Sequence, residues 1–218
     1  MKYSIIIPVV ERCDDLVKLY EEFSEEVEKL SPDFEFIFVF NFSFTKQFNQ
    51  LARYKQENKI DTITIIRFGR DFSEAIALEA GFDRAEGEYV FTLASYFQVR
   101  PEGFSEVVKE LEAGTDMVIT RRFPRKDPFF NKLQSRLFHL LAGKMVSFRF
   151  NDISCGFRGM KAEVARTITI TGDLHRFLPI LAHKNGYKIK EINVPQRKED
   201  TGLRVFSPGT YLSRVIDV

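Results

Sequence analysis

Five short apolar segments, rich in Ile, Val and Phe, recur along the first 120 residues of the chain. Each segment is continuously apolar, which is typical of strands that are buried on both faces of a sheet. Stretches with helical spacing of apolar residues lie between them and predict a repeated strand and helix order. We therefore expect strands at 3–10, 35–41, 62–68, 89–94 and 117–120, and helices at 14–30, 45–58, 72–85 and 101–113.

This alternation predicts an α/β fold of the Rossmann-type layered kind, with a central, mainly parallel sheet flanked by helices. In such folds, ligands bind in the crevice beyond the carboxyl ends of the strands. We therefore expect the functional loops to follow Pro8, Val39, Phe68 and Leu93.

The regular alternation fades after residue 120. The pattern then predicts a basic loop at 121–127, an amphipathic helix at 128–145, a turn region at 151–159, helical segments at 161–169 and 174–184, a strand at 188–194 and a polar loop at 196–202. No repeat or linker interrupts the chain. We expect a single domain over residues 1–206 and a C-terminal amphipathic segment over residues 207–218.

Charge is distributed unevenly: residues 1–115 carry 13 basic and 22 acidic side chains, and residues 116–218 carry 19 and 9. Residues 121–149 hold eight basic side chains and one acidic one, Asp127. Such a segment suits a phosphate ligand or the anionic inner face of a membrane, although a solvated helix face also explains the lysines. The N-terminus is too short for a membrane span and lacks a signal-peptide pattern. We expect a cytoplasmic protein that can be peripheral at the inner face of the membrane, with no nucleic acid partner.

Several common active-site motifs are missing. No glycine-rich dinucleotide loop follows the first strand, and no phosphate-binding P-loop sequence occurs. His139, His175 and His183 are scattered, so neither a zinc hydrolase nor a serine esterase is indicated. Cys13 and Cys155 form no metal-binding or redox pair, and we expect both to be buried small side chains.

One series of motifs extends along the whole chain: Ser4–Val9, Phe36–Val39, Ile66–Phe72 and Ala80–Gly87. In order and spacing it resembles family 2 glycosyltransferases of the GT-A fold. The second half narrows the resemblance to enzymes that load a sugar onto polyprenyl phosphate, including dolichol-phosphate mannose synthases. The residues that carry this narrower likeness are 121–122, 125–130, 135–138, 152, 155–158 and 175–179.

The donor side departs from the family pattern. Active relatives hold the nucleotide with an acidic stretch after the second strand, where this chain has Phe40–Thr45 with Phe40 and Asn41 at the donor-binding positions. Arg12 displaces the acidic residue expected after the first strand, and neighbouring Glu11 is a possible substitute.

The Asp-x-Asp motif, which binds Mg²⁺ or Mn²⁺ in active relatives, is replaced by Ala94, Ser95 and Tyr96. A hard divalent cation requires carboxylate oxygens, and it neutralises the leaving diphosphate. Ala94 offers no ligand and Tyr96 only a neutral phenol, while Gln98, a third degenerate donor-binding position, could offer one carbonyl oxygen. We therefore expect no metal, no cofactor and no catalytic residue at these degenerate positions.

The acceptor side keeps the family pattern. The resemblance implies that Arg121, Arg122 and Arg136 hold the lipid phosphate, a role that suits guanidinium groups. Arg158 and Arg176 also match family positions, or they form structural ion pairs, for which Asp152 and Asp173 are candidates.

Aromatic residues occupy or flank the position of the donor pocket: Phe40, Phe42, Phe44 and Phe97. An apolar plug that fills the pocket is the favoured interpretation, because unpaired polar groups there would be costly. A lipid-binding or partner-binding surface is the alternative.

Two functional hypotheses follow. The first is a non-catalytic glycosyltransferase relative that pairs with or regulates an active relative, as a homo-oligomer or hetero-oligomer, and still binds polyprenyl phosphate at the membrane surface. The second is an active, metal-independent transferase in which Arg12, Arg67, Arg70 and Arg204 approach the donor diphosphate.

Overall fold

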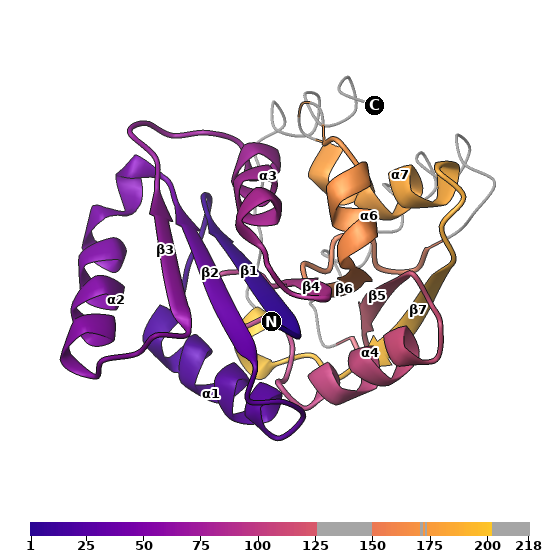
Figure 1. Cartoon of the computed structure of the whole chain (residues 1–218), viewed down its shortest axis with the longest axis horizontal. Helices are drawn as coiled ribbons and strands as arrows, with labels where there is room; N and C mark the ends of the chain where they lie inside the picture. Colours follow the sequence, from indigo (N-terminus) through magenta and orange to yellow (C-terminus); the bar gives the residue numbers. More distant parts are fainter. Residues whose placement is uncertain (126–149, 171, 173, 202–218) are drawn as a thin grey trace.

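A computed structural model describes residues 1–125, 150–170, 172 and 174–201. These residues form a seven-stranded sheet in the order β3-β2-β1-β4-β6-β5-β7 (Figure 1). The paired neighbours are parallel except for β6, which is antiparallel to both β4 and β5. The strands are β1 (Tyr3–Val9), β2 (Phe34–Phe40), β3 (Ile63–Arg67), β4 (Tyr89–Thr92), β5 (Met117–Arg122), β6 (Arg158–Lys161) and β7 (Ile189–Val194). The predicted α/β fold with a central, mainly parallel sheet is confirmed.

Helices cover both faces of the sheet (Figure 1). α1, α2 and α4 pack on one face, and α3, α6 and α7 on the other. The helices are α1 (Leu16–Glu28), α2 (Thr45–Glu57), α3 (Glu74–Arg84), α4 (Gly103–Glu112), α6 (Ala162–Thr167) and α7 (Leu178–Lys184), with short 3₁₀ turns η1 (Phe42–Phe44), η2 (Leu174–Phe177) and η3 (Lys198–Thr201).

The core lies in two layers because side chains alternate between the faces of a strand. In β1, Ile5 and Ile7 join the layer beneath α1 and α4, whereas Ile6 joins the layer beneath α3. All three are fully buried. Full burial of such a side chain contributes about 1.5–3 kcal/mol, so β1 anchors both layers.

The strand β6 was not predicted, because its four residues lie where the sequence indicates a turn and the start of a helix. Its Gly159 lies so close to neighbouring side chains that an added Cβ would meet Val107 at 2.5 Å and Phe91 at 2.8 Å. A glycine is therefore needed for β6 to fit between β4 and β5. This is a tertiary requirement, with no signal in local periodicity.

The carboxyl ends of β1, β2, β3 and β4 lie at one edge of the sheet, because these strands are parallel neighbours. The predicted functional loops therefore meet there. β4 ends at Thr92 rather than residue 94, so residues 93–98 form a loop at this edge.

Some predictions lie outside the described residues: the amphipathic helix at 128–145, the domain boundary at 206 and the C-terminal segment 207–218. Among the helices that are described, none combines the length and the apolar character that a membrane span requires.

Candidate functional site

Residues 94–98 follow β4 at the centre of this sheet edge, and they include the degenerate Asp-x-Asp positions. Ala94 packs closely against Gly156, where an added Cβ would lie 3.2 Å from the Ala94 nitrogen. Thr92 strengthens this contact by donating a 2.7 Å hydrogen bond from its hydroxyl to the Gly156 carbonyl. The first of the three positions therefore packs against the Gly156 backbone and is partly exposed.

Ser95 and Asp14 join the loop after β1 to the loop after β4. The Ser95 hydroxyl donates to the Arg12 carbonyl at 2.5 Å, and the Asp14 amide donates to the Ser95 carbonyl at 2.9 Å. The Asp14 carboxylate accepts a 2.9 Å hydrogen bond from the Phe97 amide. Glu11, the possible acidic substitute in this loop, is exposed, and Asp14 is the acidic residue that contacts the loop after β4.

Arg12 lies over the third position. Its guanidinium carbon is 4.4 Å from the centroid of the Tyr96 ring, within cation–π range. The Arg12 side chain is 44% exposed, and its Nη2 is 3.4 Å from the Asp14 carboxylate. A positive charge therefore stands beside the position where active relatives carry an acidic metal ligand.

Gln98 is buried and forms the centre of a neutral hydrogen-bond network. Its Nε2 donates to the Tyr96 hydroxyl at 2.9 Å, and its Oε1 accepts from the Gly156 amide at 2.7 Å. The same oxygen lies 3.5 Å from the thiol of Cys155, whose pKa is raised to about 11 by burial. Gly156 therefore engages one of the two lone pairs of this oxygen, and the metal contact considered for Gln98 stays a prediction.

The other two degenerate donor-binding positions, Phe40 and Asn41, also make internal contacts. Phe40 is fully buried in the layer beneath α1 and α2. Asn41 is buried and clamps the backbone of Phe72, donating to its carbonyl at 2.8 Å and accepting from its amide at 3.0 Å. This clamp holds Phe72 outside α3, which begins at Glu74 rather than residue 72.

The aromatic plug is only partly present. Phe40 and Phe97 are buried, and Phe44 is partly buried against the same core layer. Arg197 covers Phe97, with its guanidinium carbon 4.3 Å from the ring centroid, and pairs with Glu22. Phe42, by contrast, is 54% exposed and does not fill a pocket.

On the acceptor side, Arg122 is fully buried in an ion-pair network. Its guanidinium donates to both carboxylate oxygens of Asp152, at 2.7 and 2.8 Å, and to Asp200 at 2.9 Å. Ser154 accepts a further hydrogen bond at 3.1 Å. Despite the desolvation that accompanies burial, these contacts raise the pKa of Arg122 and lower that of Asp152 to about 2. This geometry gives Arg122 a structural role in place of the expected contact with lipid phosphate.

The other expected arginines fall in different environments. Arg121 is partly buried beside exposed Phe123, with its guanidinium carbon 5.4 Å from the ring centroid. Arg136 lies outside the described residues. Arg158 is buried and donates to the carbonyls of His175 and Ile153, so it makes backbone contacts rather than the ion pair considered for it. Burial lowers the pKa of Arg158.

Comparison with known proteins now identifies the family. The model of the family described as glycosyl transferase family 2 matches residues 4–169. This chain belongs to that family.

Curated relatives of this family 2 member act on a lipid phosphate, according to their names. This chain is 27% identical over 201 residues to the undecaprenyl-phosphate 4-deoxy-4-formamido-L-arabinose transferase of Photorhabdus laumondii. It is 28% identical to the transferase of the same name from Proteus mirabilis. Each match covers 92% of this chain but only 62% and 61% of the relative. The family 2 chain is thus related to polyprenyl-phosphate sugar transferases and spans under two thirds of their length.

Solved structures show the same fold. Glucosyl-3-phosphoglycerate synthase from Mycobacterium tuberculosis, in complex with UDP, superposes with a TM-score of 0.72. The match covers 99% of this chain and 77% of that one, at 14% sequence identity. At this identity the likeness supports the GT-A fold alone.

A divalent metal does not fit the described residues of the candidate site, which are residues 94–98 and the loop after β1. Across residues 1–125, 150–170, 172 and 174–201, no group of three or more His, Cys, Asp or Glu side chains could hold one. Ser95, Tyr96 and Gln98 supply only neutral oxygens, and each is engaged in a hydrogen bond. The guanidinium of Arg12 adds a positive charge that would oppose a second cation.

Proposed function

We propose that this family 2 protein has lost metal-assisted sugar transfer and acts as a partner or regulator of an active polyprenyl-phosphate transferase. The observation that carries the proposal is the closed hydrogen-bond network of residues 94–98. In that loop, the oxygens of Ser95, Tyr96 and Gln98 satisfy one another or the backbone. A metal would have to break these contacts, and residues 94–98 themselves would still supply no carboxylate, while the nearby carboxylate of Asp14 is engaged by the Phe97 amide and by Arg12.

The missing metal would have a large effect on transfer. A bound divalent cation neutralises charge on the leaving diphosphate. Loss of such electrostatic stabilisation typically costs about 3–4 kcal/mol in the transition state, or about 10²–10³ in rate. The same reaction could not proceed at its usual rate on this site without another source of positive charge.

The proposal keeps an association with polyprenyl phosphate, because the curated relatives are named as undecaprenyl-phosphate transferases. Arg121 is the described arginine that supports this contact, since Arg122 is saturated by Asp152 and Asp200. Arg136 remains a proposed contact from the sequence alone.

The first experiment is calorimetric titration of the full chain with UDP-sugars, carried out once in the presence of Mn²⁺ and once in the presence of EDTA. We expect no Mn²⁺-dependent binding. Micromolar binding that requires Mn²⁺ would refute the proposal.

A parallel titration with a short-chain, water-soluble polyprenyl phosphate tests the acceptor side. We expect Arg121→Gln to weaken this binding and the distant, exposed control Arg166→Gln to leave it unchanged.

A second function is favoured by one specific observation: the guanidinium of Arg12 lies over Tyr96, beside the place of the missing metal. Under this alternative, Arg12 stabilises the leaving diphosphate and transfer is metal-independent. A radiolabelled transfer assay in EDTA, with polyprenyl phosphate and a panel of donors, separates the two functions. Transfer that persists in EDTA and disappears in Arg12→Gln, but not in Arg166→Gln, would establish the alternative and overturn the partner proposal.

A further inference from the structure

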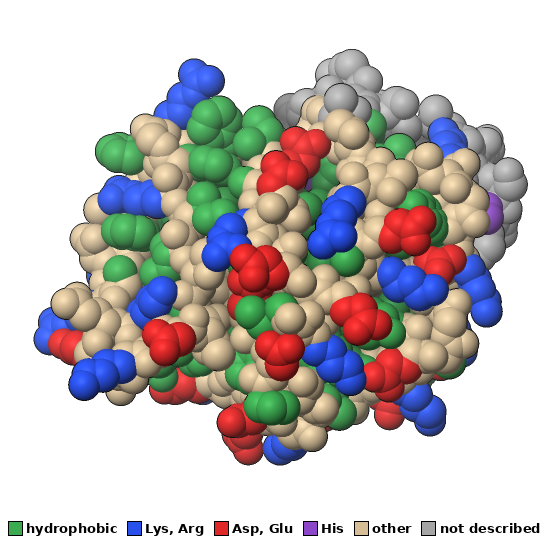
Figure 2. Space-filling model, in the orientation of Figure 1, with side chains coloured by type: hydrophobic (Ala, Val, Ile, Leu, Met, Phe, Trp, Pro, Cys, Tyr) green, Lys and Arg blue, Asp and Glu red, His purple; other side chains and the backbone are tan. Residues whose placement is uncertain are grey.

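Large hydrophobic side chains are exposed on the rim of the candidate site. Among the described residues, three of the five exposed large hydrophobic side chains follow the carboxyl ends of strands: Phe42 after β2, Ile76 in the first turn of α3 after β3, and Phe123 after β5. Their exposed fractions are 54%, 41% and 49%. Figure 2 shows hydrophobic side chains gathered over the loop between β3 and α3.

Arginines accompany the aromatic rings of this rim. Arg67 lies 5.2 Å from the Phe42 centroid, and Arg70 lies 4.8 Å from that of Phe72. On the other side of β4 in the sheet order, Arg121 lies beside Phe123. The rim therefore consists of two patches that flank residues 94–98: the β3 patch (Phe42, Arg67, Arg70, Phe72) and the β5 patch (Arg121, Phe123).

Acidic side chains near these patches accept hydrogen bonds from backbone amides and remain exposed. Asp71 accepts the Ser43 amide at 2.9 Å, and Asp15 caps α1 by accepting the amides of Val17 and Lys18 at 3.1 Å each. Glu11 is exposed as well, in the loop after β1. Within the two patches, Arg67, Arg70 and Arg121 outnumber the carboxylate of Asp71, so the patches carry a net positive charge.

We propose that this rim docks on an anionic membrane surface, with Phe42 and Phe123 at the headgroup boundary and the arginines on lipid phosphates. Exposed rings paired with cations suit such an interface, because the ring enters the apolar boundary while the charge stays with the headgroups. Each arginine near an anionic surface strengthens binding about fivefold. Charge complementarity favours the membrane over a protein partner as the occupant.

The inference rests on the proposed association with polyprenyl phosphate, which gives the protein a reason to approach a membrane. The two patches flank the candidate site, so docking would bring the site to the bilayer. A lipid phosphate could then reach Arg121 without leaving the membrane.

Co-sedimentation of the full chain with vesicles tests the surface. The vesicles contain phosphatidylcholine with or without phosphatidylglycerol, and no polyprenyl phosphate, so the result is independent of the acceptor contact. We expect binding to the anionic vesicles only. Phe42→Ser should weaken it about tenfold, and Arg70→Gln about fivefold.

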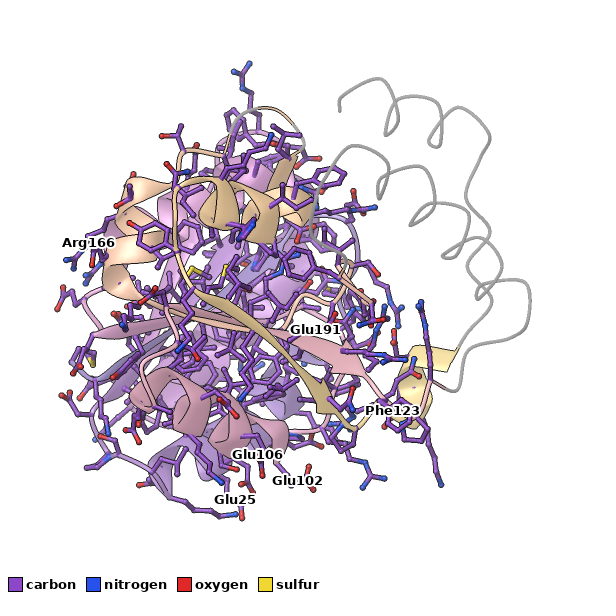
Figure 3. All side chains as sticks on the ribbon, turned by 90° about the vertical axis from the view of Figure 1, so that its right-hand side faces the viewer. Glu25, Glu102, Glu106, Phe123, Arg166 and Glu191 are labelled. Atoms are coloured by element: carbon purple, nitrogen blue, oxygen red, sulfur yellow. The ribbon has the colours of Figure 1, made fainter. Side chains whose placement is uncertain are left out.

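Two matched controls lie away from the rim. Leu30→Ser removes another exposed hydrophobic side chain beyond the carboxyl end of α1, and Arg166→Gln removes an exposed arginine on α6. Arg166 and Phe123 lie on opposite sides of the molecule (Figure 3). The inference would be overturned if the control variants lost vesicle binding as much as the rim variants, or if the wild-type chain did not bind the vesicles. It would also be overturned if Phe42→Ser bound vesicles as the wild type does but changed the oligomeric state, because the patch would then contact a protein partner. Failure of soluble polyprenyl phosphate binding would count against the proposed function instead.

Discussion

The loop after β4 and the end of β5 engage their polar side chains in internal contacts in different ways. At residues 94–98, neutral groups of Ser95, Tyr96 and Gln98 close a hydrogen-bond network. At the end of β5, Arg122 keeps the residue type of the family but directs its charge into Asp152 and Asp200. A matching residue is thus no better evidence of ligand binding than a substituted one, unless its side chain is open to the ligand.

The largest expected effect concerns the charged network. Replacement of Arg122 by Met leaves two buried carboxylates without their main cation, so we expect a loss of about 3–5 kcal/mol in the free energy of unfolding. Denaturant unfolding measures this loss. The neighbouring substitution Arg121→Gln should change stability by less than about 0.5 kcal/mol. Equal, small effects at both positions would mean that Arg122 is not structural and would reopen its role as a ligand.

Acid should weaken the same network. The folded-state pKa of Asp152 is lowered to about 2, from an ordinary value of 3.8, by Arg122. The contribution, on the order of 2 kcal/mol, is therefore complete well above pH 4 and disappears as the pH falls toward 2. The stability difference between wild type and Asp152→Asn, measured by denaturant unfolding across this range, should shrink on acidification. A difference that stays constant would contradict the ion pair.

The neutral network should be less costly to break. Gln98→Leu leaves the Gly156 amide without its side-chain acceptor, for which we expect a loss of about 1–3 kcal/mol. Thermal or denaturant unfolding measures the loss, with exposed Gln50→Leu as the matched control. If Gln98→Leu were as damaging as Arg122→Met, the distinction between the two regions would fail.

A smaller effect than at Gln98 is expected at Arg12. Its contact with Tyr96 is partly exposed, so Arg12→Gln should change the free energy of unfolding by about 0.5–1 kcal/mol or less. A much larger loss would show that Arg12 is a structural residue rather than an available cation. Such a result would remove the observation that favours metal-independent transfer.

The sequence predicted most of the fold because periodicity reports burial directly. The continuous apolar segments became β1 to β5, and the stretches between them became α1 to α4, with boundaries shifted by a few residues. The antiparallel strand β6 was missed, since its place depends on Gly159 fitting against Val107 and Phe91. That requirement comes from residues far away along the chain.

The candidate site was less predictable. Sequence comparison located the substituted metal positions, Ala94 to Tyr96, but it could not show that Gln98 is engaged by Gly156 or that Asp14 holds the Phe97 amide. These contacts join segments between 58 and 83 positions apart in the chain. No local pattern encodes such contacts.

The sequence by itself determined the layered α/β architecture, the family resemblance and the absence of an Asp-x-Asp motif, because each depends on residue types in order along the chain. Only the tertiary structure decided which polar groups face inward. In the folded chain, Arg122 is paired with Asp152 and Asp200, whereas Phe42 lies at the surface. The physical reason is that burial and hydrogen-bond partners are set by packing between distant segments, whereas residue type alone fixes only what a side chain is able to do.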